Sequence, residues 1–422
     1  MVRLEPLRAW HPNPSRFDPN DLVAPVYDTI GWEEHRQLEA RPHNAAQFTS
    51  RRTDMAVGDF VQLATRKLTE AKRAGAYIRD EVPGLYVYSI EYRPEPDILE
   101  TIPEEHRRDR YMLLGLVGAL RMENLEEVAL HERTFTDRVE ERVELERATG
   151  IHNAPIMAGY QMADHQVNDL LERDLGLDRR NLSFEANRAP LVVASLHGSV
   201  HRLWSITDPA TVEALQRMLQ PTRILILDGH HRYTAARRLR EQGHGVLPLT
   251  ILVEADDRAL LLLPWHRVLV STQWGPEAIR SKLLEEFPRA QRLDPSPSAD
   301  GSLTRLRELR DGTTQGFLMR SGVGTYIVTG PPLEHEGDNF QLLHRFLEET
   351  LRVDPASLSF VRSPAQATEE AQRSNGTAFL VPPLSMEGVA KEAFARRVMA
   401  QKSTMFLPKV AEGVLFSQLS DP

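Results

Sequence analysis

The sequence predicts an α+β protein built from two domains. Segments with strand-like alternation and segments with helical spacing of apolar residues follow one another along the whole 422-residue chain, without a long block of either type. A chain of this length exceeds one typical hydrophobic core. We therefore expect a mixed α/β core with inserted helices and strands over residues 1–270, and a smaller α/β domain over residues 271–422.

The composition excludes several classes of protein. A hydrophobic fraction of 41% with 26% charged residues is typical of a soluble globular protein. No apolar stretch approaches the roughly 20 residues of a membrane span, and the first ten residues lack the apolar segment of a signal peptide. The absence of cysteine excludes disulfides and cysteine-based zinc sites. We expect a cytoplasmic protein with no membrane partner.

The charge balance bears on the kind of ligand. A net charge of −9 disfavours general binding to nucleic acid, which usually needs a basic face. A local cluster of arginines and histidines around residues 230–240 fits a small anionic ligand better than a duplex.

The first 220 residues contain several elements that the pattern predicts. Residues 54–75 have helical spacing and end at Gly75, and Asp208 with Pro209 is a good helix start for residues 208–220. Residues 126–150 contain a polar turn followed by an amphipathic helix. Extended segments are expected at residues 3–12, 21–30, 84–93, 111–122, 190–196 and 200–207.

The segment "RILILDGHHRYTAARRLREQGHGVLPLTILV" predicts a strand, an Asp228-Gly229 turn, a helix from about His230 to Gln242, and a second strand. Ala235, Ala236 and Leu239 would pack this helix on the sheet. The first helical turn then lies exposed at the sheet edge, where its unpaired N–H groups and the positive end of the helix dipole favour an anion.

Four residues of this turn are candidates for an anion site. Gly229 allows a ligand to approach the backbone closely, and Arg232 can place a guanidinium fork on phosphate oxygens. His230 and His231 add further donors. The alternative is that Asp228 merely caps the helix while the histidines bond to neighbouring loops.

A zinc site is a poor interpretation of the two histidines. Adjacent helical residues point about 100° apart, so His230 and His231 cannot easily hold one ion together. Mg²⁺ held by a carboxylate and by ligand phosphates remains open, with Asp228 as the candidate metal ligand.

Two sequence resemblances follow from these residues. "DGHHRYTAA" resembles the phosphate-binding segment of the ParB/sulfiredoxin-like superfamily, and "LRAWHPNP" resembles the segment that opens the ParB core. His230 stands where sulfiredoxins carry their catalytic cysteine, which excludes sulfiredoxin chemistry. "APVYDTI", "LHERTF", "DGHHRYTAARR", "LLPWHRVL" and "QKSTMFLPK" resemble, in the same order, segments of a widespread family of bacterial and archaeal proteins of unknown function.

The biochemical analogues that this resemblance implies are ParB-like free L-serine kinases, which transfer phosphate from ATP or ADP to serine. Their catalytic glutamate follows the first strand, where this chain has "HPNPSRFD" and no glutamate. Asp228 and Glu132 are then the available carboxylates, and His131 is a third candidate for the base. We assign Asp228 to the metal and Glu132 to the substrate hydroxyl; His131 is equally compatible with a core histidine.

Candidate contacts also come from beyond the central segment. Arg267, at the end of an apolar strand, could meet the same anion if that strand lies beside "RILIL". Lys402, Ser403, Thr404 and Lys409 belong to "QKSTMFLPK", and from the second domain they could close over a phosphate ligand.

The sequence thus predicts a nucleotide-dependent small-molecule kinase that uses ATP or ADP with Mg²⁺, with serine as the first hydroxylated substrate to test. The alternative is a nucleotide-binding or nucleotide-hydrolysing switch that signals to a protein partner. A DNA-associated ParB relative is disfavoured, because no basic helix-turn-helix is present. A homodimer is left open.

Overall fold

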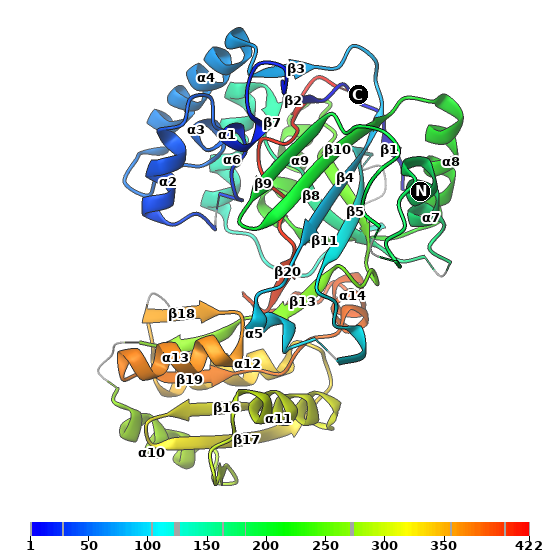
Figure 1. The fold of residues 1–422 in the computed structure, drawn as a ribbon. Helices are drawn as coiled ribbons and strands as arrows, with labels where there is room; N and C mark the ends of the chain where they lie inside the picture. The colour runs from blue at the N-terminus through cyan, green and yellow to red at the C-terminus, as the bar shows by residue number, and fades with distance from the viewer. Residues whose placement is uncertain are drawn as a thin grey trace. The chain divides into compact units, whose positions relative to one another are not determined.

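The computed structural model forms two compact units (Figure 1). One unit comprises Met1–Arg93, Asp109–Leu260 and Pro408–Pro422, and the other comprises Pro94–Arg108 and Leu261–Leu407. Residues 408–422 therefore belong to the first unit. The expected division into residues 1–270 and 271–422 had placed them in the second domain. The described residues are 2–27, 29–102, 104–121, 127–162, 164–181, 183–270, 274–354, 357–400 and 402–421.

A nine-stranded mixed sheet forms the centre of the first unit. Its order is β6-β11-β8-β12-β5-β4-β10-β9, and β1 pairs with β5. The strands are β1 (Leu4–Glu5), β4 (Leu85–Tyr92), β5 (Tyr111–Leu120), β6 (Val128–Leu130), β8 (Ile156–Tyr160), β9 (Val192–Leu196), β10 (Ser199–Ile206), β11 (Ile224–Asp228) and β12 (Leu249–Glu254). Smaller pairs join β2 (Trp10–Pro12) to β3 (Tyr77–Arg79), and β7 (Ile151–His152) to β21 (Ser417–Gln418).

Two helices of the first unit show the ends that the sequence predicts. Gly75 ends α4 in the left-handed conformation (φ 70°), and the Asp208 carboxylate accepts a hydrogen bond from the Thr211 N–H at the start of α8. The helices are α1 (Pro19–Leu22), α2 (Trp32–Glu39), α3 (Ala46–Thr49), α4 (Val57–Ala74), α6 (Thr136–Thr149), α7 (Gln166–Leu175), α8 (Pro209–Leu219) and α9 (His230–Glu241).

The directions of the strands in this sheet determine which residues lie near the carboxyl end of β11. β11 runs parallel to β6 and antiparallel to β8, and β12 runs parallel to β8. β11 and β12 are thus antiparallel, so the confirmed strand–helix–strand segment is not a parallel crossover. The carboxyl ends of β6 and β11 lie beside the amino end of β8, and the polar residues that follow or precede these strands are brought together.

Helix α9 packs differently from the sequence-based expectation. Ala235, Ala236 and Leu239 share a buried cluster with Val139 and Val143 of α6, so the prediction that they pack on the sheet is wrong. Tyr233 joins the main core, together with residues of β8 and β11. α9 therefore presents one face to the sheet and another to α6, which fixes its first turn at the end of β11.

The second unit contains a six-stranded sheet of order β15-β17-β16-β19-β14-β18 and the separate pair β13-β20. Its strands are β13 (Leu261–Pro264), β14 (His266–Leu269), β15 (Gln291–Leu293), β16 (Thr314–Ser321), β17 (Gly324–Pro332), β18 (Leu358–Val361), β19 (Thr377–Leu380) and β20 (Thr404–Leu407). Its α-helices are α5 (Pro96–Leu99), α10 (Pro276–Glu286), α11 (Ala299–Asp311), α12 (Asp338–Arg345), α13 (Pro364–Ser374) and α14 (Met386–Phe394). The predicted alternation of helices and strands is confirmed.

The prediction of an extended segment at residues 21–30 is only partly correct. Residues 21–30 were expected to be extended, but the segment begins with the end of α1 and becomes extended only from Val23; Asp28 lies outside the described residues. Within the described part of the chain, no helix has both the length and the apolar character needed to cross a membrane.

Candidate functional site

The turn between β11 and α9 is defined by its glycine and by the start of the helix. Gly229 is the residue before the helix and has φ 87°, a left-handed conformation that favours glycine. No side chain caps the amino end of α9. The first N–H groups of an α-helix have no partner within the helix, which is why helix starts often bind anions.

Asp228 is the accessible carboxylate of the turn. Its Oδ1 lies 3.4 Å from Lys409 Nζ, and its Oδ2 lies 3.7 Å from a terminal nitrogen of Arg232. Burial acts to raise the pKa of Asp228, but the positive charges of Lys409 and Arg232 outweigh it and hold the pKa below its ordinary value. The side chain is 22% exposed and that of Lys409 is 27% exposed. An ionised carboxylate and an ammonium group therefore reach the surface side by side.

Arg232 lies behind this pair rather than beside it at the surface. The residue is only 4% exposed, and its guanidinium donates a 2.8 Å hydrogen bond to the Pro155 carbonyl. A Cβ atom on Gly229 would lie 3.0 Å from Nε and from one terminal nitrogen of Arg232. The guanidinium thus packs directly against the glycine and supports the turn.

His131 and His230 form a buried pair under the turn. His230 Nε2 lies 3.3 Å from His131 Nδ1, and the two rings meet edge to face. Burial lowers the pKa of His131 to about 4, and burial with the neighbouring His131 keeps the pKa of His230 well below its usual range. Both rings are therefore neutral near pH 7, and they link the end of β6 to the start of α9.

His231 is joined to the segment that precedes α6. The Phe135 N–H donates to His231 Nε2 at 3.1 Å, and the two rings lie parallel, with an interplanar angle of 4° and centroids 6.0 Å apart. Glu132 follows the buried His131 in the same segment and is half-buried. Residues 131–135 are thereby held against the first turn of α9.

The returning C-terminal segment adds Lys409, a predicted candidate, and also Glu412, which sequence reasoning did not assign to this site. Besides Lys409, Glu412 is buried there; its backbone pairs with Ala24, and its Oε1 accepts a hydrogen bond from the Tyr27 N–H at 3.2 Å. Burial raises the pKa of Glu412 above its ordinary value. Four of the five quoted segments, those containing Tyr27, His131, Asp228 and Lys409, thus contribute residues to the first unit in or around this turn.

Comparison with known proteins places the chain in a family. A family model described as "Protein of unknown function (DUF1015)" matches residues 4–344. The chain belongs to this family. The prediction of a family of unknown function is confirmed. No curated protein matches the chain significantly.

Solved structures show distant likenesses to this DUF1015 protein. A free serine kinase in complex with AMP has a TM-score of 0.36 and 13% identity, with 69% of this chain and 87% of the kinase chain covered. A mutant of free serine kinase in complex with ADP gives the same four values. A conserved hypothetical protein from Pyrococcus furiosus has a TM-score of 0.35 and 12% identity, with coverages of 69% and 90%. TM-scores below 0.5 do not establish a common fold, so function has to be inferred from this chain's own residues.

Arg267 does not lie on a strand beside β11. β14 pairs with β18 and β19 in the second unit, whereas the neighbours of β11 are β6 and β8. The Arg267 side chain is fully buried, lies over the rings of Phe340 and Phe360, and contacts His344 Nε2 at 2.9 Å. The prediction that Arg267 meets the anion required its strand to lie beside β11, and this requirement is not met.

Lys402, Ser403 and Thr404 also belong to the second unit. Lys402 Nζ lies over the Trp265 ring, 5.4 Å from its centroid, and the Ser403 hydroxyl donates to the Ala400 carbonyl at 2.6 Å. Thr404 opens β20 and pairs with Pro264. These contacts lie within the second unit, and a role of the three residues in ligand binding stays a prediction.

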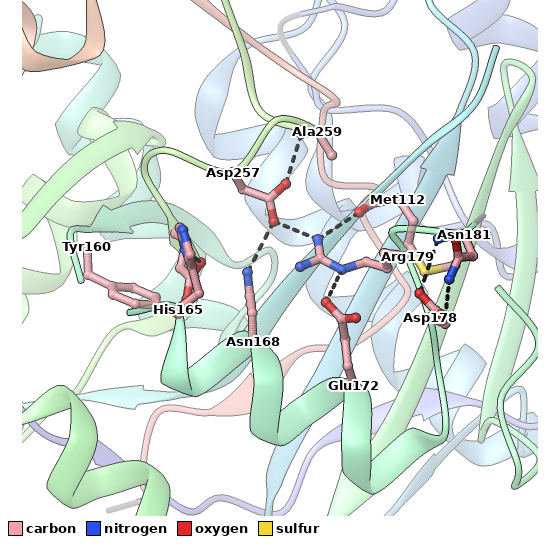
Figure 2. Close-up of polar contacts among 11 residues, drawn as sticks. Met112, Tyr160, His165, Asn168, Glu172, Asp178, Arg179, Asn181, Asp257 and Ala259 are labelled. Atoms are coloured by element: carbon pink, nitrogen blue, oxygen red, sulfur yellow. Dashed lines mark hydrogen bonds and ion pairs between the residues drawn. The ribbon is translucent and has the colours of Figure 1, made fainter. Parts of the chain in front are cut away.

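A second polar cluster lies elsewhere in the first unit (Figure 2). Asp257 accepts hydrogen bonds from Arg179 at 2.6 Å and Asn168 at 3.1 Å, which ties the turn after β12 to α7. Beside it, His165 bonds to Glu254 at 2.7 Å, and together with Asp256 they form a group whose ligand atoms lie within 4.8 Å of one another. In the described part of the chain, Asp228 belongs to no such group. A Mg²⁺ ion at Asp228 would accordingly need ligand oxygens to complete its coordination.

Proposed function

We propose that this protein is a nucleotide-dependent kinase that transfers a phosphoryl group to the hydroxyl of a small molecule, with free L-serine as the first candidate. The observation that carries the proposal is the pairing of Asp228 with Lys409 directly beside the uncapped first turn of α9. Phosphoryl transfer needs phosphate positioning, neutralised charge and an oriented hydroxyl, and this arrangement offers groups for the first two.

The phosphates would lie against the Gly229 turn. The N–H groups at the start of α9 and the Lys409 ammonium supply donors and positive charge from two sides. His231 would add a donor at the edge of the turn. Arg232 contributes indirectly, because its buried guanidinium supports Gly229 and holds Asp228 ionised.

Asp228 would hold Mg²⁺ together with phosphate oxygens, since an ionised carboxylate of 22% exposure suits this hard cation. The ion, when bound, would neutralise charge on the phosphates. Glu132 remains the proposed base for the substrate hydroxyl, because it is half-buried and follows His131 at the same edge of the sheet. His131 is buried and bonded to His230, so we assign it to positioning rather than to proton transfer.

This assignment retains the resemblance to ParB-like kinases only for the Asp-Gly turn and the helix start. The expectation that the Arg232 guanidinium contacts the phosphates does not fit this structure, because Arg232 is buried and bonded to Pro155. Lys409 takes the place of that cation.

Nucleotide binding is tested by calorimetry with ATP, ADP, CTP and GTP in the presence of Mg²⁺. A bound nucleotide at 100 times its Kd should also stabilise the protein by about 2.7 kcal/mol. Lys409→Met should weaken binding, whereas Lys67→Met, which removes a surface lysine of α4 paired with Glu70, should not. Absence of binding at millimolar nucleotide would refute the proposal.

Phosphoryl transfer needs a separate assay, because a nucleotide switch would also bind. Incubation with ATP or ADP, Mg²⁺ and L-serine should yield phosphoserine by ³¹P NMR in proportion to the nucleotide consumed. Release of inorganic phosphate alone would favour the switch instead. Asp228→Asn should abolish the product, since it removes the charge that holds the metal.

A further inference from the structure

Phe135 is a large apolar residue left at the surface next to the proposed phosphate site. Half of its area is exposed, although phenylalanine is normally buried. The other exposed large hydrophobic residues in the described ranges lie on other elements: Trp32, Ile78, Val82, Val193 and Val398. Phe135 therefore needs an explanation specific to its own position.

The ring of Phe135 is held in a defined place. Its backbone N–H donates to His231 Nε2, and its ring lies parallel to the imidazole at a centroid distance of 6.0 Å. Because Nε2 accepts this hydrogen bond, a neutral His231 carries its proton on Nδ1. Phe135 and His231 thus form two flat rings in parallel, one of them in the first turn of α9.

We propose that this aromatic pair binds the base of the nucleotide. The inference rests on the proposed function, because it places the base beside phosphates bound at Gly229. A nucleobase is flat and stacks on an aromatic face, and the solvent-exposed part of Phe135 offers such a face. His231 connects the two subsites, since it lies two residues after Gly229 in the helical turn and is stacked with Phe135.

The aromatic pair predicts low specificity for the identity of the base. Stacking is tolerant of base identity, because every base has a π face. The pair supplies a face and no pattern of donors and acceptors for the base edge. ATP and GTP should therefore bind within a few-fold of each other, and both should bind more tightly than inorganic tripolyphosphate.

The test compares ATP with tripolyphosphate on Phe135 variants of the full chain, by calorimetry with Mg²⁺. Phe135→Ala should weaken ATP binding by about 5- to 150-fold, which corresponds to the roughly 1–3 kcal/mol of one stacked base. Tripolyphosphate binding should change less than two-fold. Phe135→Tyr keeps a flat ring and should retain ATP affinity, whereas Phe135→Leu keeps apolar bulk and should not.

Val193→Ala is the matched control, because Val193 is 45% exposed and lies on β9 in the same unit. Equal losses for ATP and tripolyphosphate in Phe135→Ala would overturn the inference, since Phe135 would then only support the turn. Unchanged ATP affinity in both Phe135→Ala and Phe135→Leu would overturn it as well. If Phe135→Ala fails to fold, the comparison of Phe135→Leu with Phe135→Tyr decides.

The same data separate this inference from the proposed function. If the wild-type protein binds tripolyphosphate and ATP equally well, it has an anion site but no base subsite. That result would refute the base subsite and leave the proposed function standing. Wild-type protein that binds neither ligand contradicts the proposed function itself.

Discussion

Gly229→Ala probes the contact on which the turn depends. At φ 87° an alanine occupies the left-handed region, which costs about 1–2 kcal/mol relative to glycine. In addition, the new Cβ would lie 3.0 Å from Arg232 Nε, closer than most packed side chains tolerate. Moving the guanidinium weakens its hydrogen bond to Pro155, and such bonds to charged groups contribute about 1.5–3 kcal/mol. We expect a total loss of up to about 2.5–5 kcal/mol in the free energy of unfolding.

Gly243→Ala separates the two contributions. Gly243 follows the other end of α9 with φ 88°, but a Cβ atom there would have no heavy atom within 4 Å. It should therefore lose only the backbone term of about 1–2 kcal/mol. Both substitutions restrict the unfolded chain equally, so this effect cancels in the comparison.

Urea unfolding of both variants, followed by circular dichroism, measures the difference. Gly229→Ala should be less stable than Gly243→Ala by at least about 1.5 kcal/mol, with equal m-values. Equal stabilities would show that Arg232 moves at no cost and would refute the view that it supports the turn. In an Arg232→Ala background, Gly229→Ala should cost only the backbone term of about 1–2 kcal/mol, because the steric contact is then absent.

Three further predictions concern Arg232, two buried histidines and the cap of α8. Arg232→Lys should lower the stability by about 1–3 kcal/mol while nucleotide affinity changes little, because the guanidinium is already engaged; a large affinity loss at unchanged melting temperature would assign Arg232 to the ligand. Stability should fall as the pH drops from 6.5 toward 4, because burial lowers the pKa values of His131 and of His201 on β10 to about 4; each contributes up to about 3 kcal/mol, and a flat urea midpoint across this range would contradict it. Asp208→Ala should cost about 1 kcal/mol by removing the cap of α8, and a melting temperature equal to that of the wild type would show that the cap contributes nothing.

Local patterns predicted the central element well. The switch from the apolar run before Asp228 to helical spacing after Gly229 gave β11 and α9 at nearly their observed bounds. Gly75 and Asp208 predicted helix ends for the same reason, because turn and cap preferences act within a few residues.

The surroundings of the turn depend on contacts that no local pattern contains. Strand order decides that β6, and with it His131, lies next to β11, and it places Arg267 on a strand of another sheet. Arg232 is buried and donates a hydrogen bond to the carbonyl of Pro155, which precedes β8 and lies 77 residues earlier in the chain. The ion pair of Asp228 with Lys409 joins segments far apart in the chain, although the resemblance in "QKSTMFLPK" had already singled out Lys409.

The return of the last segment to the first unit changes what a truncation can test. A chain cut after Arg397 would lose not only the segment "QKSTMFLPK" but also residues 410–422, which belong to the first unit. Phe416 is fully buried, stacks on Trp10 at 6.1 Å and meets Tyr77 at 5.1 Å, and its backbone pairs with that of Trp10. Truncation therefore cannot distinguish a ligand role of the tail from a structural one.

A fragment of residues 1–270 should accordingly fail to fold cooperatively. Removing one buried phenylalanine side chain such as that of Phe416 costs about 3–5 kcal/mol, and the fragment also loses the backbone bonds of Glu412 to Ala24 and the β7–β21 pair. These losses together approach the roughly 5–15 kcal/mol that stabilises a typical domain. Phe416→Ala in the full chain is the milder test and should lower the free energy of unfolding of the first unit by about 3–5 kcal/mol. Sharp urea unfolding of the 1–270 fragment with native near-UV circular dichroism would refute the argument, since the first unit would then be complete without its last segment.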